Sequence, residues 1–292
     1  GEVVENFCEE FGIPFGETQG GKSACKSSHP YCLGGIGVTG TSASNKIAKD
    51  ADCVIAIGTR MSDFTTSSKW LFQGENVRFV TINNNRYHAY KYDAVKAVGD
   101  AKATVTALAE ILRAKGYKSA YTNEVAEAKA EWDAELERLG GIVCTGEDFE
   151  PIIKPRDPRT VPEFVRMYGT SLTQTAALAT LRACMGPDDI VITAGGSLPS
   201  CMQRVWKTDK RGGYHVEYGY SCMGYEVGRK IRDAFPICRI YHIYGLTEAC
   251  PRVSYLPPEY FSDYPDCVGI PLKSVSIKIL NEQGDPCYGN EE

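Results

Sequence analysis

Residues Cys53 to Ile57 are Cys-Val-Ile-Ala-Ile, a continuous apolar run that ends at Gly58. A second such run extends from Val77 to Ile82 and ends at three consecutive asparagines. Continuous rather than alternating apolar residues are typical of strands covered on both faces, as in a parallel sheet flanked by helices. The two runs therefore predict a doubly wound, Rossmann-like α/β domain, and ligands of such sheets lie beyond the carboxyl ends of the strands.

Helical patterns surround these runs. Residues 2–12 predict a helix that ends on a glycine, residues 44–50 predict a short helix, and residues 101–115 predict a third. The third places its apolar side chains on one stripe toward the sheet: Val105, Leu108, Ile111 and Leu112. Residues 123–139 predict a surface helix with a narrow apolar stripe: Val125, Ala128, Trp132, Leu136 and Leu139.

A second, partial α/β domain follows a proline-rich crossing at residues 146–162. A helix is predicted over 172–185, and a buried strand over 190–193 leads into the loop Ala194-Gly195-Gly196-Ser197. From about Gly228 the pattern changes. A basic helix is expected over 229–235 and a strand over 238–244.

The C-terminal fragment is predicted to be partly antiparallel. Val275, Ile277 and Ile279 alternate with polar residues, as in a half-buried strand, and residues 281–285 suit a hairpin turn.

The composition of the chain limits the classes of function that it can have. The chain has 292 residues, enough for about two domains, and a formal net charge of −5. That charge argues against nucleic acid or an anionic membrane as a partner. No run approaches the roughly 18 apolar residues of a membrane span. The N-terminus has neither the basic start nor the apolar core of a signal peptide. We therefore expect neither nucleic acid nor a membrane as a partner.

The 12 cysteines are scattered from Cys8 to Cys287, without a Cys-x-x-Cys pair or a His cluster at zinc spacing. Several lie in apolar runs, where a thiol behaves as a small apolar side chain. We interpret them as the reduced thiols of a cytoplasmic protein rather than as metal ligands or disulfides.

Residues Tyr214 to Val227 are aromatic and glycine-punctuated, with Met223 between Cys222 and Gly224. From residue types alone this is either a buried turn whose Met fills a gap or a backbone that approaches a flat ligand. Together with Ala194 to Trp206, the stretch resembles the start of the diphosphate-binding domain of thiamine-diphosphate enzymes. Within that group it is most similar to the ring-opening hydrolases of trihydroxycyclohexane-1,2-dione, which serve inositol catabolism.

The N-terminal part resembles the middle domain of the same hydrolases at residues 17–23, 34–40, 57–60 and 63–69. In relatives such as acetolactate synthase that domain can hold FAD, and we expect no flavin here. Taken by itself, the segment Gly34 to Gly40 suits either a phosphate loop or a tight turn packed against the sheet, and its spacing favours the turn.

The resemblance implies thiamine diphosphate and Mg²⁺ as cofactors. It places Gly196, Ser197 and Leu198 along the diphosphate, the Ser221 carbonyl opposite the pyrimidine amino group, and Met223 as the wedge that bends the cofactor. The family's catalytic Glu lies in a domain that no part of these residues resembles, so no catalytic residue is assigned. The family's metal motif is not found after Val227. We expect this chain alone not to bind the cofactor productively.

The segment Tyr244 to Glu248, Tyr-Gly-Leu-Thr-Glu, and the segment Val268 to Pro271 resemble adenylate-forming acyl-CoA synthetases. That resemblance implies ATP or AMP as ligand, with Tyr244 against adenine, Gly245 in the nucleotide motif, Thr247 at the phosphate and Glu248 on Mg²⁺. The family's upstream phosphate loop, its ribose-binding Asp and its catalytic Lys have no counterpart in the sequence.

We thus predict four segments. They are a central Rossmann-like domain (1–118), a helical and proline-rich linker (119–165), an incomplete diphosphate-binding domain (166–227) and an incomplete adenylate-forming fragment (228–292). The chain is interpreted as an incomplete or chimeric hydrolase of a C–C bond in a cyclic 1,2-diketone, inactive alone, whose parent enzyme is a homo-oligomer. The alternatives are an acyl-CoA synthetase fragment and a non-catalytic nucleotide- or partner-binding module.

Overall fold

The structure is a computed structural model that describes most of the chain. The described residues are 1–144, 157–159, 162–163, 166–167, 169, 171–193, 195–216, 242–244, 253–264, 267–273, 275–278, 280 and 286. The chain divides into two compact units, Gly1–Ser221 and Cys222–Glu292. Within the described ranges, none of the helices has both the length and the apolar content that crossing a bilayer requires.

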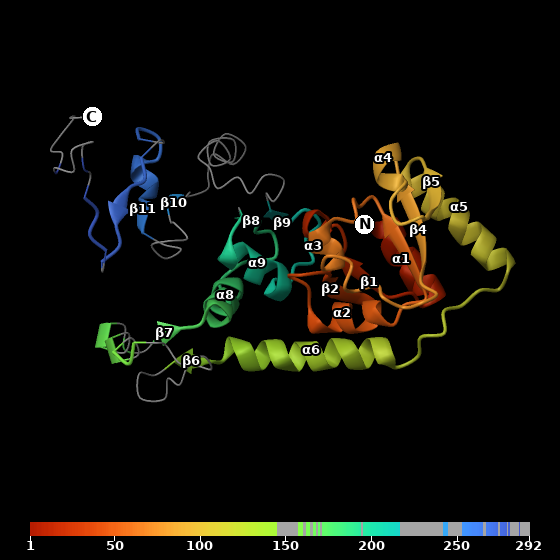
Figure 1. The fold of residues 1–292 in the computed structure, drawn as a ribbon, viewed down its shortest axis with the longest axis horizontal. Coiled ribbons are helices and arrows are strands. Elements are labelled where there is room, and N and C mark those ends of the chain that lie inside the picture. Colours follow the sequence, from red (N-terminus) through yellow and green to blue (C-terminus); the bar gives the residue numbers. More distant parts are fainter. Residues whose placement is uncertain are drawn as a thin grey trace. The chain divides into compact units, whose positions relative to one another are not determined.

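A parallel sheet of three strands organises the first unit (Figure 1). Its strands are β3 (Cys53–Ile57), β4 (Arg78–Asn83) and β5 (Val95–Val98), in that order. Ile57 pairs with Ile82, and Asn83 with Val98, so the carboxyl ends of the strands lie at one edge. The predicted α/β fold with parallel strands is confirmed. The sequence pattern does not predict β5. This strand is Val-Lys-Ala-Val rather than a continuous apolar run, and its Val95 and Val98 are 71% and 46% exposed.

Two helices, α1 (Glu2–Phe11) and α5 (Ala101–Ala114), supply the core beside β4. The buried side chains of this core are Phe7, Cys8, Phe11, Ile82, Val105 and Ala109. Gly12 ends α1 in the left-handed conformation, with φ 70°. The predicted stripe of α5 is wrong at Ile111, which is 54% exposed. At about 100° per residue, Ile111 lies roughly 120° around the helix from Val105.

A second parallel pair, β1 (Phe15–Glu17) and β2 (Cys32–Gly35), lies in the same unit, and the 3₁₀ turn η1 (Gln19–Gly21) follows β1. The helices α2 (Ser42–Lys49) and α6 (Glu124–Gly140) pack against each other, and Figure 1 shows α6 running beside α2. The buried residues of this second core are Leu33, Ala43, Val125, Ala128 and Trp132, which confirms the stripe predicted for the surface helix.

Two helices of a single turn follow the carboxyl ends of the main strands. They are α3 (Asp63–Thr66), after β3, and α4 (Arg86–Ala89), after β4.

The remainder of the first unit forms a small α/β layer. The strands β6 (Val143–Cys144) and β7 (Ser171–Leu172) form an antiparallel pair. The elements α8 (Gln174–Ala183), β8 (Val191–Thr193), α9 (Ser197–Val205) and β9 (Tyr214–Val216) follow, and β8 is parallel to β9. The buried side chains of this layer are Leu178, Met202, Val205, Trp206 and Tyr214. The predicted strand at 190–193 and helix at 172–185 are thus present with shifted ends.

The second unit contains an antiparallel sheet in the order β10 (His242–Tyr244), β11 (Ser254–Leu256), β12 (Ile270–Pro271), with the 3₁₀ turn η2 (Pro258–Tyr260) after β11. Leu280 forms an antiparallel bridge with Pro286, as expected on either side of the predicted hairpin turn. The strand predicted around Val275 and Ile277 is wrong over the described residues 275–278, which form no ladder. The helix predicted over 229–235 lies outside the described residues.

Candidate functional site

The loop between β8 and α9 carries the predicted diphosphate contacts. Gly196 has φ 135° and ψ −174°, a conformation that is open essentially to glycine alone, and it caps the N-terminus of α9. It follows the carboxyl end of β8, whose partner β9 runs parallel to it. In α/β sheets this edge is where ligands bind. Gly196, Ser197 and Leu198 are therefore brought together in one turn at the expected edge.

The first turn of α9 presents backbone amides to solvent. Gly196 and Ser197 are exposed, and the Ser200 N–H donates back to the Gly196 carbonyl at 3.1 Å. The first N–H groups of a helix have no partner within the helix, which here applies to Ser197 and Leu198, whereas Pro199 has no N–H group. Aligned peptide dipoles make this end of the helix partly positive. The turn suits the anionic tail of a cofactor.

A buried serine, Ser23, connects the segment after η1 to β9 through two hydrogen bonds. The Ser23 hydroxyl donates to the Tyr214 carbonyl and accepts from the Tyr214 N–H, both at 3.1 Å. Ser23 is 2% exposed and has φ 67°, a left-handed conformation that costs an ordinary residue free energy. Sequence reasoning quoted Ser23 only as part of a family motif. The two residues are 191 positions apart in the sequence, so no local pattern reveals the contact.

Glu17 and Lys22 form a buried ion pair beside that serine. The Lys22 Nζ lies 3.8 Å from the Glu17 Oε2, and the two side chains are 2% and 3% exposed. The Glu17 Oε1 accepts from the Ser23 N–H at 3.0 Å. Burial raises the pKa of Glu17 and lowers the pKa of Lys22, because it disfavours the charged form of each, and the opposite charge of the partner counteracts both shifts.

The loop from Gly34 to Gly40 is a packing surface for α9. The Thr39 hydroxyl donates to the Gln203 Oε1 at 2.6 Å, and the Arg204 Nε donates to the Gly40 carbonyl at 3.1 Å. A Cβ on Gly35 would lie 3.2 Å from the Gln203 carbonyl oxygen, so the absent side chain permits this approach. Helix side chains thus cover the loop, which agrees with a tight turn rather than a phosphate loop.

Of the other predicted site residues, the structure describes only Tyr244. Tyr244 is the last residue of β10 and belongs to the second unit, whereas Gly196 belongs to the first. Ser221, Met223, Gly245, Thr247 and Glu248 lie outside the described residues. Among the residues that the structure does describe, no group of three or more His, Cys, Asp or Glu side chains could hold a metal ion.

Cysteine side chains that the structure describes are free thiols: Cys8, Cys25, Cys32, Cys53, Cys184, Cys201 and Cys267. Burial raises the pKa of Cys8 and of Cys32 to about 12, and that of Cys25 to about 11. The nucleophile and metal ligand is the thiolate, so these three buried thiols are inert near neutral pH.

Two families match the sequence. Residues 1–108 match the central domain of thiamine pyrophosphate enzymes, and residues 103–292, more than half of the chain, match the AMP-binding enzymes. The chain belongs to the AMP-binding enzyme family and carries a thiamine pyrophosphate enzyme central domain. The resemblance of its N-terminal part to thiamine enzymes is confirmed, and so is a resemblance to adenylate-forming enzymes.

Curated relatives of this AMP-binding family member are ring-opening hydrolases. The 3D-(3,5/4)-trihydroxycyclohexane-1,2-dione hydrolase of Clostridium botulinum is 50% identical over 249 residues, 84% of this chain and 38% of the relative. Hydrolase 2 of Bacillus cereus is 51% identical over 248 residues, and the hydrolase of Clostridium perfringens 50% over 247, with the same coverage. The homologues indicate the thiamine-diphosphate-dependent hydrolase family. The chain spans 38% of the length of these relatives.

The hydrolase similarity and the AMP-binding match overlap along the chain, because the first covers 84% of it and the second begins at residue 103. Two buried hydrogen-bond contacts show how the overlapping segment packs against the central domain. Ser23 of the thiamine central domain holds Tyr214, and Thr39 of that domain holds Gln203. Residues 171–193 and 195–216 therefore belong to the same compact unit as the central domain.

Proposed function

We propose that the first unit provides the central domain and the start of the diphosphate-binding domain of a thiamine-diphosphate-dependent hydrolase. The proposed substrate is a cyclic 1,2-diketone of inositol catabolism, cleaved at a C–C bond in the cytoplasm. The observation that carries the proposal is the turn of Gly196, Ser197 and Leu198 at the carboxyl edge of β8 and β9. The 50% identity to curated hydrolases of this specificity supports the choice of substrate.

The residues of this chain have a binding role in the proposal. The backbone N–H groups of Ser197 and Leu198 would donate hydrogen bonds to the diphosphate oxygens, since a helix N-terminus favours negative charge. Gly196 would let the backbone come close to the phosphates. Ser221 and Met223 would contact the pyrimidine and the bend of the cofactor. When bound, thiamine diphosphate supplies the carbon nucleophile that attacks the substrate carbonyl.

We further propose that the 292 residues alone do not turn over substrate, and that the parent enzyme is a homo-oligomer. A diphosphate that lacks its Mg²⁺ ligands loses several kcal/mol of binding free energy, on the scale of an uncompensated buried charge. Among the described residues, no group of three or more His, Cys, Asp or Glu side chains could hold a metal ion. Calorimetry of the full chain with thiamine diphosphate and Mg²⁺ is expected to show no micromolar binding, and micromolar binding would overturn this part.

Inorganic pyrophosphate tests the turn separately. At millimolar pyrophosphate we expect the amide resonances of Gly196, Ser197 and Leu198 to shift in the ¹⁵N spectrum of the full chain. The variant Gly196→Ala is expected to abolish the shifts, because φ 135° is closed to alanine. The variant Gly116→Ala, whose φ of 62° is also positive but whose position is remote from the turn, serves as the control. Unchanged resonances in the wild-type chain would exclude the turn as a diphosphate site.

The AMP-binding match supports a second candidate, acyl adenylation in the second unit. Tyr244, Gly245, Thr247 and Glu248 would then bind the nucleotide and its Mg²⁺. Adenylation also needs a phosphate clamp and a catalytic Lys to stabilise charge in the transition state. The sequence shows no match to either, so we expect no ATP–pyrophosphate exchange with carboxylic acids. Exchange that disappears in Glu248→Gln would establish this function instead.

A further inference from the structure

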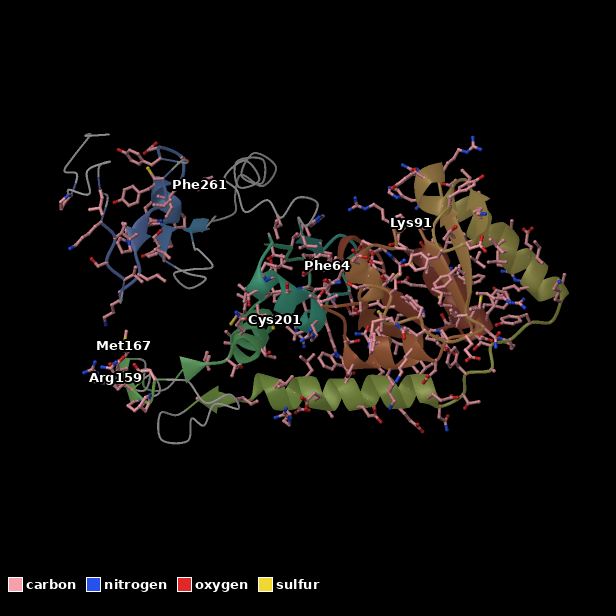
Figure 2. The ribbon with its side chains drawn as sticks, in the orientation of Figure 1. Phe64, Lys91, Arg159, Met167, Cys201 and Phe261 are labelled. Atoms are coloured by element: carbon pink, nitrogen blue, oxygen red, sulfur yellow. The ribbon has the colours of Figure 1, made fainter. Side chains whose placement is uncertain are left out.

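The helix α4 carries a groove that none of the proposed functions uses. The groove is shallow and largely open to solvent, and it is lined by Arg86, Tyr87, Tyr90 and Lys91. With Lys96, whose Nζ lies 4.9 Å from the centre of the Tyr90 ring, these residues form what we call the α4 surface. Tyr87 is 75% exposed and Tyr90 is 57% exposed. Figure 2 shows Lys91 at α4, at the edge of the side chains drawn.

The base of the α4 surface is fixed. The Asn85 side chain accepts from the Tyr87 N–H at 2.9 Å and so caps α4. The buried Thr81 hydroxyl, on β4, donates to the Ala89 carbonyl at 2.6 Å. The Lys91 Nζ donates to the Arg60 carbonyl at 3.1 Å, which ties α4 to the loop after β3. The exposed rings therefore project from an anchored turn and lose little conformational entropy when a partner binds.

The charge of the α4 surface is uncompensated. Residues 84–98 contain three cations, Arg86, Lys91 and Lys96, and one carboxylate, Asp93, although the whole chain has a formal net charge of −5. Within the described part of the chain, none of these three cations forms an ion pair. The Lys91 ammonium lies 5.9 Å from the Tyr87 ring centre and Lys96 faces Tyr90. Carboxylates from outside the unit would meet an unneutralised field.

The exposed tyrosine rings and the positive charge of the α4 surface together indicate what kind of partner would bind there. Exposed Tyr and Arg side chains are the residues enriched at the centres of protein interfaces. A site for a small molecule encloses most of its ligand, whereas this groove is open along both tyrosines. We propose that the α4 surface docks an acidic segment of a partner polypeptide, whose carboxylates pair with Arg86 and Lys91 and whose apolar side chains lie on Tyr87 and Tyr90. The proposal is independent of the function proposed above.

A random copolymer of glutamate and tyrosine is the probe, because it presents many acidic sequences with rings. Titrated against the full chain and followed by anisotropy of a label on the copolymer, it is expected to bind and to dissociate as salt increases. The double variant Arg86→Glu/Lys91→Glu is expected to weaken binding by at least about tenfold. The variant Tyr87→Ala/Tyr90→Ala is expected to weaken it at constant charge.

The matched control is Lys102→Glu/Lys115→Glu, which makes the same change in net charge on exposed residues of α5 and just after it. It should leave the affinity within about twofold of the wild type if the effect is local rather than due to net charge. Circular dichroism checks that each variant is folded, and Arg86→Gln/Lys91→Gln replaces the glutamate variant if that variant unfolds.

Several results would overturn the proposal. They are the absence of copolymer binding, an equal loss of affinity in the control pair, and no loss in the tyrosine variant. Tighter binding of single-stranded DNA or of ADP through the same four residues would also reject it, since the occupant would then be a nucleic acid or a nucleotide.

Discussion

The buried Lys22 and the half-buried Lys91 each lie near a tyrosine ring, but the two pairs have opposite roles. The Lys22 Nζ lies 5.6 Å from the Tyr214 ring centre, and the Lys91 Nζ lies 5.9 Å from the Tyr87 ring centre. The Lys22 side chain is 2% exposed and pairs with Glu17, whereas Tyr87 is 75% exposed. The same pair of residue types therefore joins two layers of the fold in one place and forms a surface open to partners in the other. The physical reason is desolvation: burial removes the Lys22 ammonium from water, so that it needs the Glu17 carboxylate as a partner.

The largest expected effect comes from Lys22→Met. It leaves the Glu17 carboxylate buried without its cation, and we expect the free energy of unfolding to fall by about 3–5 kcal/mol. Urea unfolding followed by tryptophan fluorescence measures this, because Trp132 and Trp206 are buried in the same unit. The double variant Glu17→Gln/Lys22→Met should recover most of the loss. Lys91→Met, at the half-buried counterpart, removes one hydrogen bond to the Arg60 carbonyl and leaves no buried charge unpaired, so it should cost no more than about 0.5–1.5 kcal/mol. Equal losses at Lys22 and Lys91 would refute the comparison.

Ser23→Ala is expected to have the next largest effect. It removes both hydrogen bonds to Tyr214 in a buried site, which costs about 1–3 kcal/mol. Hydrogen exchange of the Tyr214 amide should accelerate, because the Ser23 hydroxyl is an acceptor for that N–H. Ser28→Ala is the control, since the Ser28 side chain is exposed. Unaltered exchange at Tyr214 would show that the serine does not hold β9.

The pH dependence follows from Glu17. Burial raises its pKa above the ordinary value of 4.5, so the folded state retains this proton after the unfolded state has lost it. The free energy of unfolding should then fall as pH rises from 4.5 through the folded-state pKa, by at most about 1.4 kcal/mol per pH unit for one proton. Glu17→Gln should lack this component of the slope. Identical slopes in the two proteins would mean that Glu17 does not titrate as described.

The smallest effect on stability is expected at the α4 surface. Tyr87→Ala/Tyr90→Ala should change the free energy of unfolding by no more than about 0.5 kcal/mol per residue, because both rings are largely exposed. The same variant should weaken binding of the acidic copolymer. Thermal unfolding measured beside the titration separates the two effects. A large loss of stability would show that these rings belong to the fold rather than to a docking surface.

Several elements could be predicted from local sequence. The run Cys53 to Ile57 is β3 with the same ends, and Gly12 terminates α1 in the left-handed conformation. The stripe of α6 and the strand that leads into the Gly196 loop also follow from periodicity. Each of these signals is contained within one turn or one strand, so neighbouring residues alone specify it.

Other features could not be predicted in this way. The short strand β2 contains two glycines, and β5 is exposed, so neither shows a continuous apolar run. Val275 and Ile277 alternate with polar residues, but the described residues there have no partner strand, and alternation by itself forms no ladder. The limits predicted for the four segments stay predictions, as do the roles of all the predicted site residues: Gly196, Ser197, Leu198, Ser221, Met223, Tyr244, Gly245, Thr247 and Glu248.

The sequence by itself determined the α/β class, the position of β3, the glycine turn at Gly196 and the family relationships. Only the tertiary structure decided that Glu17, Lys22 and Ser23 are buried against β9, and that Gln203 and Arg204 cover the loop from Gly34 to Gly40. The reason is physical. Periodicity in the sequence shows which face of a helix or strand is apolar. The burial of Glu17 and Lys22, and therefore the pKa shift of each, depends on distant parts of the chain such as Tyr214.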